Sequence, residues 1–192
     1  MKEMNRERII NTLVKKNGAL SYLEIGVGDN TNFKSIKAIY KVSVDPHQKS
    51  TFQVTSDEYF AGNGAHFDVI FIDGLHLEEQ VYKDIINSLN CLQSGGVIVC
   101  HDMNPAQEED QVREHTPGKT WNGDVWKAWV TLRKERDDLD MYVIDCDCGC
   151  GIITKGSQQK LETDLPLTFT NLDDNRKGWL NLKSVEEIEW LE

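Results

Sequence analysis

The sequence predicts an α/β fold built on a mostly parallel β-sheet, and two observations carry this prediction. Continuous apolar runs of strand length, such as residues 67–72, indicate strands that are buried on both faces, as the strands of parallel sheets are. Between such runs lie amphipathic stretches such as residues 78–92, where apolar residues recur at helical spacing. Strands that alternate with helices form βαβ units, which build a parallel sheet.

The individual elements follow from apolar periodicity and from breaks at glycine and proline. A first helix is expected over residues 6–16, because the apolar pattern stops near Gly18. Four strands that alternate with helical stretches should come next, near residues 20–25, 40–44, 68–72 and 96–100.

The second half of the chain adds fewer elements. A helix over 125–136 should precede two strands at 141–144 and 151–154. The sequence Ser-Val-Glu-Glu that begins at Ser184 is a capping box and predicts a last short helix. With 192 residues, the chain suits a single domain spanning 1–192.

Composition and charge exclude some classes of partner. The formal net charge of -11 disfavours binding to nucleic acid, which needs a concentrated basic face. The chain begins with a charged stretch, and no apolar run approaches the ~20 residues that cross a bilayer. We therefore expect a cytoplasmic protein that binds neither nucleic acid nor membrane.

The five cysteines do not form a disulfide framework of the kind that small secreted proteins use. Cys146, Cys148 and Cys150 alternate, so an extended segment would place all three thiols on one face. Zinc sites usually separate paired cysteines by two to four residues. A structural role for these cysteines is therefore favoured over a metal or redox role.

A turn rich in glycine follows the first predicted strand and points to a nucleoside ligand. Gly26 and Gly28 allow backbone conformations that are closed to other residues, and they let a ligand approach the main chain. Asp45 ends the next apolar run about 20 residues further on, where a carboxylate that binds ribose belongs in a nucleotide-binding βαβ unit. The third glycine of the dinucleotide fingerprint is missing.

The pattern Glu24-x-Gly26-x-Gly28, followed by Asp45, resembles the first two motifs of class I S-adenosylmethionine-dependent methyltransferases. An acid beside the glycine turn suits the cationic sulfonium of that cofactor and would repel a diphosphate. The resemblance implies that cofactor binding also involves Asp73, and that Asp57 lies near the adenine.

A second pair of motifs narrows the resemblance. Asp73-Gly74-x-His76 follows one strand, and Gly-Gly-Val-Ile-Val-Cys-His101-Asp102 contains the next. This order closely resembles a subfamily that includes sugar and antibiotic O-methyltransferases. The resemblance implies a Rossmann-like, doubly wound, mostly parallel sheet with an antiparallel final strand.

The same motifs suggest two routes to catalysis. Related O-methyltransferases use carboxylates at positions matching Asp73 and Asp102 to bind a divalent ion that acidifies the acceptor hydroxyl. His101 stands where many relatives have a second acid, so Asp73, His101 and Asp102 form a metal-ligand set that suits Mg²⁺ less well than an all-oxygen set, and Mn²⁺ or no ion remains open. Alternatively, His76 or His101 acts directly as the base.

Two segments outside these motifs concern the methyl acceptor. Residues 103–124 are long, polar and irregular, as lids and binding loops often are. Trp121 lies outside the helical stripe that contains Trp126 and Trp129, so it is expected to stack on the acceptor. The C-terminal extension, residues 155–192, should pack onto the domain.

These observations predict an S-adenosylmethionine-dependent methyltransferase that methylates an oxygen of a small molecule such as a sugar or a glycosylated metabolite. Two alternatives remain open. A nicotinamide-dependent oxidoreductase is disfavoured by the missing third glycine. A nucleoside-binding module without catalytic activity would keep the glycine turn.

Overall fold

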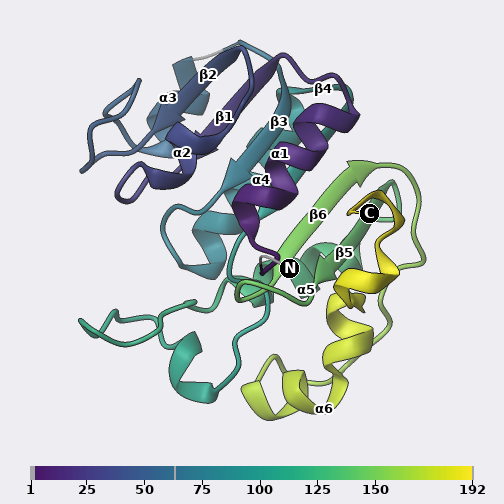
Figure 1. Ribbon diagram of the computed structural model, residues 1–192. Helices are drawn as coiled ribbons and strands as arrows, with labels where there is room; N and C mark the ends of the chain where they lie inside the picture. The colour runs from purple at the N-terminus through teal and green to yellow at the C-terminus, as the bar shows by residue number, and fades with distance from the viewer. Residues whose placement is uncertain (1–2, 63, 192) are drawn as a thin grey trace.

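The computed structural model describes residues 3–62 and 64–191 and contains a seven-stranded sheet (Figure 1). The strands are β1 (Ser21–Ile25), β2 (Tyr40–Val44), β3 (Phe67–Ile72), β4 (Leu92–Cys100), β5 (Leu139–Ile144), β6 (Cys150–Lys155) and β7 (Leu182–Lys183), in the spatial order β2-β1-β3-β4-β6-β5-β7. Neighbouring strands from β2 to β4 are parallel, whereas β6 runs antiparallel to both β4 and β5. This confirms the predicted Rossmann-like sheet and its antiparallel element.

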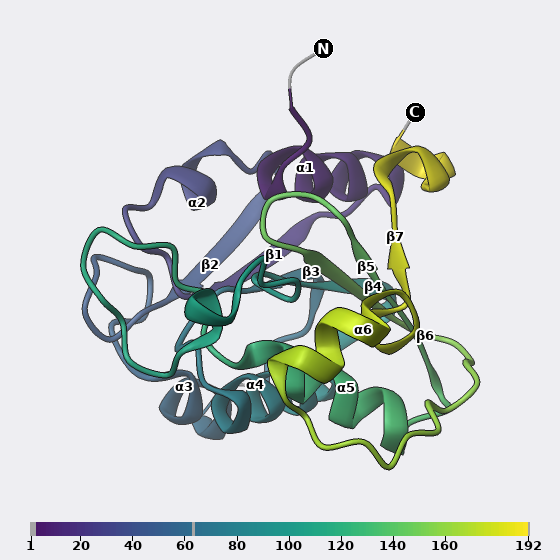
Figure 2. The ribbon, with the colours of Figure 1, turned by 90° about the horizontal axis from the view of Figure 1, so that it is seen from below.

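Helices cover both faces of the sheet (Figure 2). They are α1 (Arg6–Lys16), α2 (Thr31–Ser35), α3 (Ser56–Gly62), α4 (Glu78–Asn90), α5 (Val125–Glu135) and α6 (Phe169–Leu180), with 3-10 turns at Glu108–Gln111, Val185–Glu187 and Glu189–Leu191. One apolar layer lies between the sheet and α1, and it includes side chains of the last 3-10 turns. The other layer lies beneath α4, α5 and α6.

Local sequence explains the helices that periodicity predicted. Asn5 caps α1 by accepting a hydrogen bond from the Arg8 backbone at 3.1 Å, and Ile9, Ile10 and Leu13 are buried against the sheet. In α5, Trp126 and Trp129 are fully buried, which confirms that they belong to the core. The capping box at Ser184 is present and begins a 3-10 turn.

The C-terminal extension contains two elements that the sequence did not predict, α6 and β7. Few side chains of α6 are buried, chiefly Leu172, Trp179 and Leu180, so its apolar pattern is weak. The helix is held by tertiary contacts: Arg133 donates hydrogen bonds to the carbonyls of Gly178 and Trp179. The chain then adds β7 parallel to β5.

The carboxyl ends of the parallel strands meet at one edge of the sheet. The Gly26 amide donates to Val44 O at 2.8 Å, the Asp73 amide to Ile25 O at 2.8 Å, and the His101 amide to Ile72 O at 3.0 Å. The chain reverses its winding direction at β1, which has β2 on one side and β3 on the other. Ligands of open α/β sheets bind at such a switch point. Within the described residues, no helix has the length and apolar character needed to span a membrane.

Candidate active site

A cavity of about 510 Å³ opens at this switch point. Its walls come from the segments that follow β1, β2 and β3, together with the start of α3 and one residue of α4. Gly26, Gly28, Asp45, Asp57, Asp73 and Gln80 are among its lining residues. Five of these six were predicted to contact the cofactor. The volume lies within the ~300–1,000 Å³ range of small-molecule and cofactor sites.

The two glycines of the turn have different roles. Gly26 has φ +81°, and a β-carbon there would lie 2.1 Å from the carbonyl oxygen of Asp73. Any side chain at Gly26 would therefore separate the ends of β1 and β3. Gly28 has φ +48° and open space around the position of a β-carbon, so a ligand can approach its backbone closely.

Asp45 lines the cavity with a carboxylate that the backbone holds in place. One oxygen accepts a hydrogen bond from the Val27 amide at 3.0 Å, and the other accepts from the amides of His47 and Gln48 at 2.8 Å. A carboxylate offers about four lone-pair sites, so Asp45 keeps capacity for a ribose hydroxyl. Its position agrees with the predicted role.

Glu24 is not among the residues that line the cavity. Its side chain is 1% exposed and accepts hydrogen bonds from Tyr22 Oη and, at 3.0 Å, from Asn32 Nδ2. Burial raises the pKa of Glu24 to about 7, although both hydrogen bonds act in the opposite direction. Glu24 thus ties β1 to α2.

Asp57 lies at the cavity rim, where Gln80 Nε2 donates to it at 3.0 Å. The hydrogen bond from Gln80 lowers the pKa of Asp57. Its carboxylate remains half exposed and therefore accessible to a ligand.

A cluster of charged side chains borders the cavity at the ends of β3 and β4. Asp73 Oδ1 lies 3.4 Å from both His76 Nε2 and His101 Nδ1. Asp102 Oδ1 lies 3.1 Å from His101 Nδ1, and Asp102 Oδ2 lies 3.4 Å from His76 Nδ1. The structure thus brings together all four residues that the two motifs predicted.

Two further residues complete this cluster, and sequence reasoning did not find them. Arg6 donates to Asp73 Oδ2 at 2.9 Å and also binds both oxygens of Asp147. Asp147 Oδ1 in turn lies 3.5 Å from His101 Nε2. Neither residue belongs to a recognisable motif, because Arg6 precedes the first strand and Asp147 lies in the β5–β6 turn.

The carboxylates and the cationic groups stabilise each other's charged forms. Burial disfavours the charge on each residue, but His101, His76 and Arg6 together hold the pKa of Asp73 well below its usual range. Burial lowers the pKa of His101, but Asp73, Asp102 and Asp147 outweigh this effect and raise the pKa well above its usual value. The pKa of His76 is also raised, by Asp73 and Asp102. Either imidazolium is therefore stabilised once it has accepted a proton.

The ligand geometry for a divalent ion differs from the predicted set. Asp73, His76 and Asp102 each offer one ligand atom, and these atoms lie within 4.8 Å of one another. His101 instead groups with Asp147 and Cys150. Two carboxylates with one imidazole suit Mn²⁺ better than Mg²⁺, which prefers oxygen ligands and retained waters. Arg6 already occupies one oxygen of Asp73.

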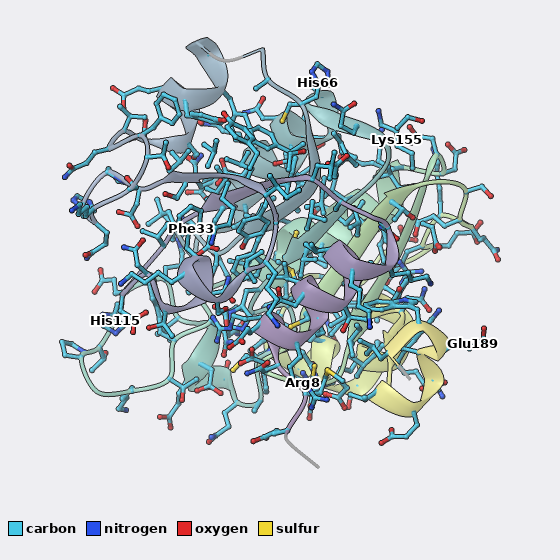
Figure 3. All side chains as sticks on the ribbon, turned by 45° about the horizontal axis from the view of Figure 1, so that its top comes forward. Arg8, Phe33, His66, His115, Lys155 and Glu189 are labelled. Atoms are coloured by element: carbon cyan, nitrogen blue, oxygen red, sulfur yellow. The ribbon has the colours of Figure 1, made fainter. Side chains whose placement is uncertain are left out.

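The segment 103–124 covers this cluster. Gly123 approaches the His76 carbonyl so closely that a β-carbon there would lie 1.9 Å from it. The indole of Trp121 stacks on the His76 ring with centroids 4.6 Å apart, and Trp121 Nε1 donates to Val112 O at 2.7 Å. His115 packs on Trp121 from the exterior, where Figure 3 shows it. One face of Trp121 therefore covers His76 and is not free to stack on an acceptor.

A second cavity, of about 550 Å³, lies on the side of the cluster that faces α6. It is lined by Asn104, Thr120 and Asn122 of the covering segment, by the β5–β6 turn, and by Arg176 of α6. Asn122 also donates to Asp102 Oδ1 at 2.6 Å, and Asp147 lines this cavity as well. The charged cluster therefore connects the two cavities.

Comparison with known proteins identifies the family. A family model described as a methyltransferase domain matches residues 8–103, which is half of the chain. This range contains the glycine turn, Asp45 and both motifs at the strand ends. No curated protein matches the sequence.

Several solved structures with the same fold are methyltransferases of low sequence identity. The S-adenosylhomocysteine-bound methyltransferase PaMTH1 of Podospora anserina is 16% identical, with 79% of this chain and 78% of that chain covered and a TM-score of 0.57. The Bacillus cereus O-methyltransferase, in complex with S-adenosylhomocysteine, is 14% identical over 80% of each chain, with a TM-score of 0.55.

MycE is a methyltransferase of the mycinamycin biosynthetic pathway that was solved with Mg, S-adenosylhomocysteine and mycinamycin VI. It is 17% identical over 81% of this chain and 49% of that chain, with a TM-score of 0.51. These structural similarities confirm the fold. The family match includes the glycine turn that lines the first cavity. The chain thus belongs to a methyltransferase-domain family and is an S-adenosylmethionine-dependent methyltransferase of the class I fold.

Proposed function

We propose that this enzyme methylates a hydroxyl oxygen of a small polar molecule, such as a sugar or a glycosylated metabolite. The observation that supports this proposal is the cluster of Asp73, His76, His101 and Asp102 between two cavities. The first cavity lies at the switch point of the sheet and contains the glycine turn, as we expect of the cofactor site. The other is lined largely by amide, carboxylate and guanidinium groups, which suit hydroxyl groups rather than an apolar acceptor.

The cofactor cavity would hold S-adenosylmethionine through this chain's own residues. The Gly28 backbone can lie against the ligand, Asp45 can accept hydrogen bonds from ribose hydroxyls, and Asp57 can accept from the adenine amino group. Asp73 borders the cavity and would place negative charge beside a cationic ligand. The cofactor itself supplies an activated methyl group, so the protein needs only to align the acceptor and take its proton.

His76 fits the role of base better than His101 does. Its side chain is 16% exposed, compared with 3% for His101, and it lies beneath the covering segment. His76 Nδ1 lies 3.1 Å from the carbonyl of Trp121, which favours the tautomer with the proton on Nδ1 and leaves Nε2, 3.4 Å from Asp73 Oδ1, as the proton acceptor. Asp73 and Asp102 would stabilise the resulting imidazolium.

A divalent ion is a second route, supported by the grouping of Asp73, His76 and Asp102. An ion held there would lower the pKa of the acceptor hydroxyl. MycE is a relative in fold that was solved with Mg. The two routes predict opposite responses to a chelator, because only the second loses activity when ions are removed.

We also propose roles for the parts of the chain and a limit on its partners. Residues 1–192 would form one methyltransferase domain, with 103–124 as a lid over the acceptor and 155–192 as an extension that completes the acceptor cavity through α6. The net charge of -11 disfavours nucleic acid as a partner.

Calorimetry with S-adenosylhomocysteine and with NAD tests the cofactor. Binding of the first and not the second is expected, and the reverse would restore the oxidoreductase alternative. Transfer of a labelled methyl group from S-adenosylmethionine to a panel of sugars and glycosides tests the reaction. Tight cofactor binding without transfer to any hydroxyl acceptor, while His76→Ala behaves like the wild type, would favour a binding module over an enzyme.

A further inference from the structure

A group of metal-binding side chains lies beside the active site, in the β5–β6 turn. An extended segment would have placed Cys146, Cys148 and Cys150 on one face, but the structure has a tight turn instead. The Gly149 amide donates to Cys146 O at 2.8 Å, and Asp147, Cys148 and Gly149 have φ values of +47°, +61° and +90°. The turn brings Cys146 back toward Cys150, at the start of β6.

The contacts within this turn gather four different side chains. The thiols of Cys146 and Cys150 influence each other: Cys150 lowers the pKa of Cys146, and Cys146 raises the pKa of Cys150. His101, Asp147 and Cys150 each offer a ligand atom, and these atoms lie within 4.8 Å of one another. His101 Nε2 faces Asp147 Oδ1 at 3.5 Å.

His101 provides an independent indication that a ligand belongs here. Its side chain is 3% exposed, yet neither ring nitrogen has an aligned hydrogen-bond partner among the described residues. The carboxylates of Asp73, Asp102 and Asp147 lie 3.4, 3.1 and 3.5 Å away but are not aligned for a hydrogen bond. A buried polar group without a hydrogen bond costs about 1–3 kcal/mol, so such a group calls for an explanation. A metal ion bound to Nε2 would provide one.

We propose that Cys146, Asp147, Cys150 and His101 bind a thiophilic divalent cation, with zinc as the best match. Zinc in structural sites is four-coordinate and takes sulfur, nitrogen and oxygen ligands. Three residues separate Cys146 from Cys150, which falls within the usual zinc spacing of two to four. The backbone amide and Nε of Arg6 both donate to Asp147 Oδ2, but Oδ1 accepts a single hydrogen bond from Arg6 and has a further lone pair for the ion.

This site is separate from the carboxylate trio of Asp73, His76 and Asp102, because it contains sulfur and would select a softer ion. It would also have a structural consequence for the acceptor. Cys146, Asp147 and Cys148 line the second cavity, so a bound ion would fix one wall of that cavity.

Cobalt provides the test, because a thiolate ligand gives Co²⁺ an intense sulfur-to-metal absorption in the near ultraviolet that carboxylate and imidazole ligands do not give. The metal-free, fully reduced, full-length protein would be titrated with Co²⁺ and then with Zn²⁺. We expect a sulfur band that saturates at one equivalent, is weakened in Cys150→Ser and in Cys146→Ser, disappears when both cysteines are replaced, and is displaced by Zn²⁺. Cys148→Ser is the matched control, because its thiol lies in the same turn but outside the group, and it should keep the band.

Three results would overturn the proposal: no sulfur band in the wild type, an unchanged band in Cys150→Ser, or equal loss in Cys148→Ser. Circular dichroism establishes whether each variant is folded. If Cys150→Ser fails to fold, Cys146→Ser decides, because Cys146 is only partly buried. In that variant a weakened or shifted band supports the site, and an unchanged band counts against it.

Discussion

The buried carboxyl group of Glu24 should make the stability of this protein depend on pH in a specific direction. Burial raises the pKa of Glu24 from 4.5 to about 7. Between these values the unfolded chain has lost the proton and the folded protein keeps it, so stability falls as pH rises and levels off above about 7. The difference between these two pKa values corresponds to about 3 kcal/mol of unfolding free energy, since a tenfold change in proton affinity is worth ~1.4 kcal/mol.

Glu24→Gln removes this titration while keeping a side chain that can accept hydrogen bonds from Tyr22 and Asn32. Relative to the variant, the wild type should lose about 3 kcal/mol of unfolding free energy between pH 4.5 and 7. Urea unfolding at several pH values, followed by tryptophan fluorescence, measures the difference. The exposed Glu162 provides the control Glu162→Gln.

Parallel stability curves for the wild type and Glu24→Gln would refute this reasoning. They would mean that the carboxyl group is solvated, or that its hydrogen bonds outweigh its burial. The same variant tests the placement of Glu24 outside the cofactor cavity. Its affinity for S-adenosylhomocysteine should remain close to that of the wild type, and a large loss would show a direct contact.

Four further predictions concern the site. Asp45→Ala should weaken S-adenosylhomocysteine binding by about 1–3 kcal/mol in calorimetry, and unchanged affinity in a folded variant would remove the ribose assignment. Gly26→Ala should unfold the protein or abolish cofactor binding, because its β-carbon would lie 2.1 Å from Asp73 O, whereas Gly64→Ala, with open space around it, should behave like the wild type. If Asp73 and Asp102 hold an ion, excess EDTA should abolish methyl transfer and Mn²⁺ should restore it; full activity in EDTA, with no metal found by elemental analysis, would leave a histidine as the base. Trp121→Ala should lower turnover or raise the acceptor KM while S-adenosylmethionine affinity stays intact, and lost cofactor binding with normal acceptor kinetics would show that the segment closes on the cofactor.

Much of the fold could be predicted because its signals are local. The apolar runs of β1 to β4 and the helical stripes of α1, α4 and α5 each lie within a few turns of chain, and the structure confirms them. The register could not be predicted in full: β4 begins at Leu92, where it pairs with Phe67 before an irregularity, and not at residue 96. The extension packs onto the domain through Trp179 and Leu180, which are buried, whereas Leu165 is exposed.

The motifs likewise predicted the four residues at the strand ends, because parallel strands deliver their carboxyl ends to one edge of the sheet. They did not predict which histidine groups with which carboxylates. His76 groups with Asp73 and Asp102, whereas His101 contacts these two carboxylates through Nδ1 and also faces Asp147 through Nε2 at 3.5 Å. The contact between His101 and Asp147 depends on the position of the β5–β6 turn, which no local sequence pattern predicts.

The sequence by itself therefore determined the α/β sheet, the glycine turn and the methyltransferase motifs, since each depends on residues close together in the chain. Only the tertiary structure decided which residues surround the strand ends at the candidate active site. Arg6 and Asp147 are 141 residues apart, yet their ion pair lies within the site. The indole of Trp121 stacks on the His76 ring, so this face of the indole cannot stack on an acceptor. The physical reason is that these contacts arise from the packing of α1, the covering segment and the β5–β6 turn against one sheet edge, which depends on the whole fold.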